Sequence, residues 1–141
     1  MGRAVVHFEI EGLDGAKLRE FYRGLFDWDA QVDPTNPSEY GLIERDENSD
    51  GAGNGLGGAI AQVPDVPSTT WKGRTRAEGH TGGVTIFVEV PDVETALQRA
   101  EELGGERMLG PDPIFPGVEI GRFADPEGHL IGVITERKSE D

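Results

Sequence analysis

The chain contains no cysteine among its 141 residues. This absence excludes disulfide bonds, thiolate zinc sites and cysteine nucleophiles together. A bound metal ion would have to be held by carboxylates and by the three histidines, His7, His80 and His129.

Basic residues are also few. Thirteen lysines and arginines stand against 27 acidic residues, which gives a net charge of −14 at pH 7. Such a chain is repelled by nucleic-acid phosphates and by anionic membranes, so we expect neither as a partner. Lysine is rare beside arginine. This pattern fits a salt-adapted protein, in which high ionic strength screens self-repulsion, or an ordinary acidic protein from a GC-rich genome.

Long apolar runs are missing as well. The longest, residues 84–88 and 130–134, fall far short of the about 18 residues that cross a bilayer. The chain does not open on a charged and then apolar leader. We therefore expect a soluble, cytoplasmic protein.

The first half of the chain has the pattern of a strand, a helix and three strands. Residues 4–11 alternate apolar and polar side chains, as a half-buried strand does. Asp14 stands where a helix needs an N-cap, and strands are predicted at residues 28–32, 40–45 and 56–62, with a polar loop at 46–55. The apolar stripe of the predicted helix consists of Leu18, Phe21, Tyr22, Leu25 and Phe26.

The second half repeats this order. A strand at 84–90 precedes Asp92, which caps a helix that ends at Gly104 and Gly105, and strands follow at 107–109, 119–124 and 130–135. A shift of 78 residues places Asp14 on Asp92. We predict one domain, residues 1–141, with module one at 4–62, a linker at 63–82 that is a lid or disordered, module two at 83–135 and an acidic tail at 136–141. The stripe of the second helix is Val93, Ala96, Leu97, Ala100 and Leu103.

Several segments are similar to a known superfamily. The sequence has HFEI at residues 7–10, FY at 21–22, LFDW at 25–28, VEVPDV at 88–93, AEELGG at 100–105 and FADPEGH at 123–129. With two βαβββ modules, these segments resemble the vicinal oxygen chelate (VOC) superfamily of glyoxalases, bleomycin resistance proteins and extradiol dioxygenases, and within it the small predicted lactoylglutathione lyases. The resemblance implies an α+β fold in which a curved sheet surrounds a cleft and the helices lie on the convex side.

The resemblance also implies a divalent metal ion, held by one ligand from the first and one from the last strand of each module. His7 occupies the first of these positions, but Thr85 and Gly132 occupy two others, and residues 56–62 contain no carboxylate. With one ligand of four, we expect no metal and no other cofactor. The alternative is a metal that His7 holds together with carboxylates of the cleft face, Glu9, Glu89 or Glu119.

The expected site residues follow from strand alternation. His7 and Glu9 are the candidate catalytic residues; the alternative for His7 is a core imidazole hydrogen-bonded to a neighbour such as Glu9. His80 and His129 are expected to be solvated, and Trp71 of the linker is either a lid aromatic or an anchor for a dimer partner. The candidate ligand-binding residues of the cleft are Thr85, Phe87, Glu89, Phe115, Arg122 and Gly132. Core filling by Phe87 and a surface salt bridge of Arg122 are the alternatives for those two residues.

Three functions are consistent with these residues. The first is a glyoxalase and bleomycin-resistance-like protein, a homodimer, that binds a small organic molecule in its cleft with an incomplete metal site. The second is a metal-dependent lyase or isomerase of the lactoylglutathione lyase type, and the third is a protein that sequesters an antibiotic without chemistry. The sequence leaves open whether a reaction is catalysed.

Overall fold

The computed structural model describes residues 2–35, 39–62 and 83–136. The predicted linker, with His80 and Trp71, and nearly all of the predicted acidic tail lie outside these residues. The described residues form two compact units. The N-terminal unit comprises residues 7–62 and 83–85, and the C-terminal unit comprises residues 2–6 and 86–136.

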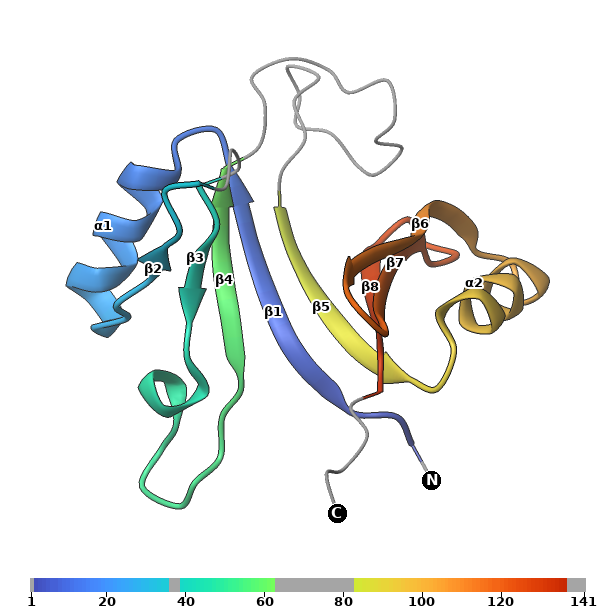
Figure 1. The fold of residues 1–141 in the computed structure, drawn as a ribbon, viewed down its shortest axis with the longest axis horizontal. Helices are drawn as coiled ribbons and strands as arrows, with labels where there is room; N and C mark the ends of the chain where they lie inside the picture. The colour runs from blue at the N-terminus through green and yellow to red at the C-terminus, as the bar shows by residue number, and fades with distance from the viewer. Residues whose placement is uncertain (1, 36–38, 63–82, 137–141) are drawn as a thin grey trace. The chain divides into compact units, whose positions relative to one another are not determined.

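The N-terminal unit has the predicted order of elements (Figure 1). Its elements are β1 (Val5–Gly12), α1 (Gly15–Phe26), β2 (Gln31–Val32), β3 (Gly41–Ile43), the 3-10 helix η1 (Arg45–Asn48) and β4 (Gly57–Gln62). The strands lie in the order β2-β3-β4-β1, with β1 parallel to β4 and the other pairs antiparallel. Asp14 caps α1 as predicted, because its side chain accepts a hydrogen bond from the Lys17 amide.

The C-terminal unit repeats this topology (Figure 1). Its elements are β5 (Gly83–Val90), α2 (Val93–Glu102), β6 (Glu106–Phe115), β7 (Val118–Ala124) and β8 (Leu130–Thr135). The order is β5-β8-β7-β6, and β5 runs parallel to β8. The predicted α+β class with two βαβββ modules is confirmed, and a cleft shared by the modules stays a prediction.

The core of the C-terminal unit lies between α2 and its sheet. Leu97 and Val93 of the helix pack with Val90 and Val133 of the strands, and all four are buried. A Cβ atom at Gly121 would lie 2.8 Å from a methyl group of Leu97. The helix therefore rests directly on the backbone of β7, which explains the glycine at that position.

Three predictions about packing are wrong. Phe21, Leu25 and Phe26 of the α1 stripe are more than half exposed, and so is Leu103, which lies just beyond α2. Ile86, expected to face a helix, is also exposed. The sheet of the N-terminal unit is narrow where α1 lies, with two residues in β2 and three in β3, so it covers only part of a wide apolar stripe.

Strand β6 is longer than predicted, since it runs to Phe115 and not to Leu109. Pro111 and Pro113 argued against a strand, because proline has no N–H to donate to a sheet. β6 is the edge strand and pairs only with β7, with register shifts along the pair. An edge position tolerates proline because one side of the strand has no neighbour.

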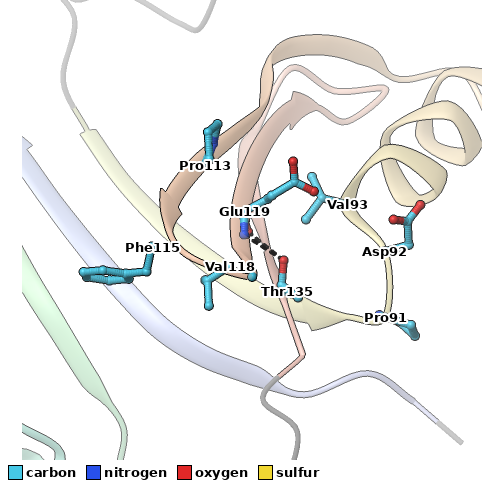
Figure 2. A pocket seen from close by; sticks show the side chains of 9 residues that line it. Pro91, Asp92, Val93, Pro113, Phe115, Val118, Glu119 and Thr135 are labelled. Carbon is cyan, nitrogen blue, oxygen red and sulfur yellow. Dashed lines mark hydrogen bonds between the residues drawn. The ribbon is translucent and has the colours of Figure 1, made fainter.

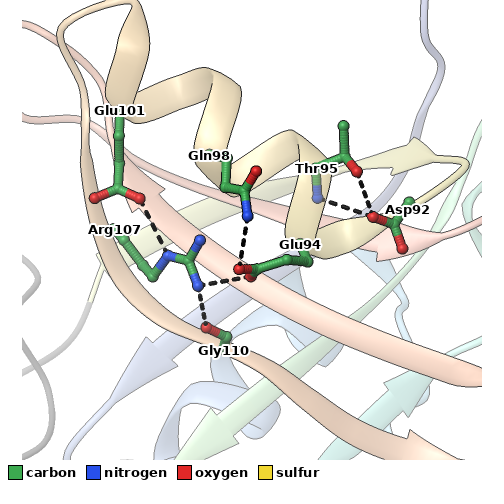
Figure 3. A network of polar contacts seen from close by, with 7 residues as sticks. All are labelled: Asp92, Glu94, Thr95, Gln98, Glu101, Arg107 and Gly110. Carbon is green, nitrogen blue, oxygen red and sulfur yellow. Dashed lines mark hydrogen bonds and ion pairs between the residues drawn. The ribbon is translucent and has the colours of Figure 1, made fainter.

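Arg107 joins β6 to α2 (Figure 3). Its Nη1 donates to Glu94 Oε2 at 2.7 Å and to the Gly110 carbonyl at 3.3 Å, and its Nε lies 3.4 Å from Glu101 Oε1. The hydrogen bond from Arg107, with a second from Gln98, lowers the pKa of Glu94 below its usual value of 4.5. The ionised form of Glu94 is therefore favoured in the folded chain.

We expect Arg107→Met to lower the thermal midpoint at pH 7, and the loss to shrink at acid pH. A carboxylate with a depressed pKa stabilises the fold above its unfolded pKa of 4.5, and this contribution disappears as the pH falls through the lower folded value. Arg99→Met is the matched control, because the Arg99–Glu102 pair lies on an exposed helix surface and such pairs contribute little. Thermal unfolding between pH 3 and pH 7 measures both; equal losses for the two variants would contradict the assignment.

Candidate functional site

Two polar side chains of β1 lie on the sheet face opposite α1. Phe8 faces α1, because its ring lies 5.4 Å from that of Trp28, which stacks on Tyr22 of the helix. Adjacent strand residues point to opposite faces. His7 and Glu9 therefore point away from the helix, as strand alternation predicts.

Tyr40, just before β3, connects these two side chains. Its hydroxyl lies 2.8 Å from His7 Nε2 and donates to Glu9 Oε2 at 3.1 Å. The rings of His7 and Tyr40 are nearly parallel, with an interplanar angle of 11°. Glu9 is 6% exposed, so this carboxylate is held inside the protein. We call His7, Tyr40 and Glu9 the polar triad.

The direction of the hydrogen bonds defines a protonation pattern. A phenol has one proton, and the proton of Tyr40 is directed to Glu9. The contact between His7 and Tyr40 is then completed when Nε2 of His7 carries a proton and donates it to the phenol oxygen. This tautomer places the basic lone pair of the imidazole on Nδ1. A positive charge gained there is favoured by the carboxylate at the other end of the triad.

Sequence reasoning missed Tyr40. The expected hydrogen bond partner of His7 was a neighbour such as Glu9, and the structure places the hydroxyl of Tyr40 between the two. A signal was present, because Tyr40 and Leu42 are two residues apart in a predicted strand, and Leu42 pairs with Ala59, which also pairs with Glu9. Tyr40 therefore belongs to the face that carries Glu9.

Four of the predicted cleft residues share one face of the C-terminal unit. Phe87, Gly132 and Arg122 are consecutive partners across β5, β8 and β7. Glu89 follows Phe87 on the same face of β5. This face is opposite α2, because Val133, next to Gly132, packs on the helix.

Arg122 and Phe87 are more buried than a solvated cleft residue should be. Phe87 is 3% exposed and Arg122 is 8% exposed, and the guanidinium lies 5.0 Å from the centre of the ring. This distance is typical of a cation–π contact. Arg122 is thus not the exposed salt-bridge residue that was the alternative for it.

Gly132 has a packing role. A Cβ atom there would lie 2.4 Å from two ring atoms of Phe87, so the ring covers the glycine and leaves no room for a side chain. The resemblance places a metal-binding carboxylate at this position. A glutamate at residue 132 would require Phe87 to move.

The described residues do not fit a metal centre. Residues 2–35, 39–62 and 83–136 contain no group of three or more histidine, aspartate or glutamate side chains placed to hold an ion. Nor can Gly132 supply a ligand, and Thr85 offers only a neutral hydroxyl. Within these ranges, His7 therefore lacks the accompanying ligand set that the superfamily uses.

Phe115 and Thr85 lie apart from the face that carries Phe87 and Arg122. Phe115 ends β6 and lines a depression of about 270 Å³, which Figure 2 shows close to the start of α2. Its cross-strand partner is Val118, whereas the partner of Arg122 is Leu109. Thr85 is buried and belongs to the three residues of β5 that group with the N-terminal unit. The depression is also lined by Pro91, Asp92, Val93, Pro113, Gly117, Glu119 and Thr135.

His129 is exposed, as predicted. It lies in the turn between β7 and β8, where its Nδ1 is 2.9 Å from Asp125 Oδ2. The backbone amide of His129 donates to Asp125 and is the main cause of a lowered Asp125 pKa. These contacts stabilise the turn.

The comparisons with known proteins agree with this fold. Residues 7–134 match the model of the glyoxalase-like domain family. A variant of methylmalonyl-CoA epimerase from Streptomyces coelicolor, solved with 2-nitronate-propionyl-CoA, is 18% identical, with a TM-score of 0.61 over 95% of this chain and 97% of that chain. A glyoxalase/bleomycin resistance protein/dioxygenase superfamily member from Vibrio splendidus is 16% identical, with a TM-score of 0.54 over 96% and 100% of the two chains. No curated protein matches the chain at a significant level.

At these identities the two solved structures show a shared fold and no more. Among the described residues, no helix is both long and apolar enough to span a membrane.

Proposed function

The chain belongs to the glyoxalase-like domain family of the VOC superfamily, and from this premise we propose that it binds a small organic molecule at the polar triad, without a metal ion. The observation that carries the proposal is the Tyr40 hydroxyl, held between His7 Nε2 and Glu9 Oε2 on the sheet face opposite α1. The face that carries Phe87 and Arg122 is the second candidate surface for the same ligand.

The triad has a chemical preference. With Nε2 protonated, the Nδ1 lone pair of His7 accepts a hydrogen bond from a hydroxyl, thiol or carboxylic acid. A buried carboxylate such as Glu9 repels a second negative charge beside it. We therefore expect ligands that present an X–H group to His7, such as phenols, thiols and protonated acids.

The same geometry favours a second function, proton transfer on the bound molecule. A base must be oriented and its positive charge stabilised once it has taken a proton. Tyr40 orients the imidazole, and Glu9 stabilises the imidazolium through the phenol. In such a reaction, the proton moves from the ligand to Nδ1 of His7 and is returned from there to the product. The triad favours this route over a metal-dependent lyase, because it supplies an oriented base and no ligand set.

A thermal-shift screen tests the binding function. The panel holds small thiols, phenols and carboxylic acids, together with methylmalonyl-CoA, which the name of one structural neighbour suggests. We expect at least one compound to raise the thermal midpoint of the wild-type protein, and His7→Ala to abolish that shift. His129→Ala is the matched control, because this exposed histidine lies in the turn of the other unit, and it should respond as the wild type does.

Each outcome of the screen decides between the proposals. A shift retained in His7→Ala contradicts the triad as the binding site. Stoichiometric metal in the purified protein that is lost in His7→Ala would instead establish the metal-dependent alternative. Mass spectrometry of each bound compound after incubation in D₂O separates proton transfer, which adds deuterium, from binding alone.

A further inference from the structure

Helix α1 presents an apolar stripe to solvent. Lys17, Phe21, Gly24 and Leu25 are spaced by three, four, seven and eight residues, so they lie along one side of the helix. Phe21 and Leu25 are both 59% exposed. We call these four residues the α1 stripe.

From this surface we propose that a second copy of the chain docks on the α1 stripe, with the two helices packed antiparallel. The proposal is independent of the ligand function, because the stripe lies on α1 whereas the polar triad lies on the sheet face turned away from α1. Large apolar side chains exposed side by side mark contact surfaces more often than isolated ones do.

Gly24 is the first argument for a helix as the partner. It lies inside a helix, where glycine is less favourable than any other residue except proline. A Cβ atom at Gly24 would meet no atom within 4 Å, so nothing within the described chain requires a glycine there. The missing side chain leaves a hollow between Phe21 and Leu25. In a close helix pair, such a hollow receives a large side chain of the facing helix.

Self-complementarity is the second argument. In an antiparallel pair whose two-fold axis passes near the middle of the stripe, Phe21 of one copy faces Leu25 of the second copy. The hollow at Gly24 then meets an apolar side chain of the other helix on both sides of the axis. A stripe that carries both the hollow and the side chains that fill it fits a two-fold contact.

Charge is the third argument. The chain has a net charge of −14, yet α1 itself is net positive, with three basic side chains, Lys17, Arg19 and Arg23, and one acidic side chain, Glu20. The antiparallel arrangement brings Lys17 of each copy towards Asp27 and Asp29, which directly follow the helix of the other. Opposite charges thus flank the apolar centre.

The size of the stripe indicates a weak dimer. Phe21 and Leu25 each expose on the order of 100 Å², whereas a stable interface buries about 800 Å² from each partner. We expect a dissociation constant on the order of micromolar. The two copies repel each other through their net charge, so a rise in KCl should strengthen the dimer by screening this repulsion.

Sedimentation velocity of the full chain from about 1 to about 200 µM tests the proposal. We expect a monomer–dimer equilibrium that shifts to dimer in molar KCl. Leu25→Lys should raise the dissociation constant by about tenfold or more, because it places a charge in an apolar contact. The matched control is Leu103→Lys, since Leu103 is 64% exposed just beyond α2, and it should leave the dissociation constant within about twofold.

Gly24→Gln separates loss of contact from loss of folding. Glutamine favours a helix over glycine, so this variant should melt higher than the wild type at a concentration where both are monomers, and yet dimerise more weakly. A monomer at all concentrations, equal weakening by Leu25→Lys and Leu103→Lys, or unchanged dimerisation of Gly24→Gln would each overturn the proposal. Dimerisation that weakens in KCl would show a contact held by charges and not by the stripe.

Discussion

Replacing Leu97 with alanine is expected to lower the free energy of unfolding by about 2–5 kcal/mol. Leu97 is 0% exposed and lies in the centre of the cluster between α2 and its sheet. Truncation loses the transfer free energy of the side chain and leaves a cavity that the glycine backbone of β7 cannot fill. The cost falls at the upper end of this range if the neighbouring Val93 and Val133 do not move.

Leu103→Ala provides the control for this measurement. It removes the same atoms from an exposed leucine six residues later, and it should change the free energy of unfolding by less than about 0.5 kcal/mol. Urea unfolding of the two variants and the wild type measures both values. Similar losses for Leu97→Ala and Leu103→Ala would contradict the burial that the structure gives them.

The regular elements could be predicted from local patterns. Period-two alternation located β1, β5, β7 and β8 to within about a residue, because one face of each strand is covered and the other is not. The caps at Asp14 and Asp92 gave the starts of both helices. These signals are local, so they can be read without knowledge of the partners.

The packing of α1 could not be predicted in this way. Amphipathic spacing shows that a helix has an apolar side but not how much of that side its sheet covers. The two residues of β2 and three of β3 cover part of it, and Phe21 and Leu25 stay exposed. The length of β6 was missed for a related reason, because only its edge position makes Pro111 and Pro113 acceptable.

The candidate site was predicted in half. Strand alternation placed His7 and Glu9 on one face, and Phe87, Glu89, Arg122 and Gly132 on another, as the structure has them. The contact that organises the first group is between residues 33 apart in sequence, His7 and Tyr40. No local pattern contains such a contact. The glycine at 132 looked like a lost metal ligand, and only the ring of Phe87 above it explains the residue.

Tyr40→Phe is expected to weaken ligand binding by about 10–100-fold, which corresponds to the loss of about one to two charge-assisted hydrogen bonds. The substitution removes one oxygen atom and leaves the ring in place. It breaks the hydrogen bond to Glu9 and the one from His7, so the imidazole loses the contact that fixes its orientation and tautomer. Binding at Nδ1 then competes with other orientations of the ring.

Tyr22→Phe makes the same chemical change elsewhere in the unit. Tyr22 packs on Trp28 and Phe26 with ring centres 5.6 and 5.9 Å apart, on the helix side of the sheet. Its substitution should leave ligand affinity within about twofold. The pair of variants therefore separates a role of the Tyr40 hydroxyl from a general effect of removing a phenol.

The most direct test of the polar triad is the dissociation constant of the tightest ligand from the screen, measured by calorimetry for the wild type, Tyr40→Phe and Tyr22→Phe. If Tyr40 holds His7 in its binding orientation, Tyr40→Phe binds about 10–100-fold more weakly and Tyr22→Phe binds as the wild type does. Equal affinities for all three proteins would show that the ligand does not depend on the triad, and would contradict the proposed function at its central residue.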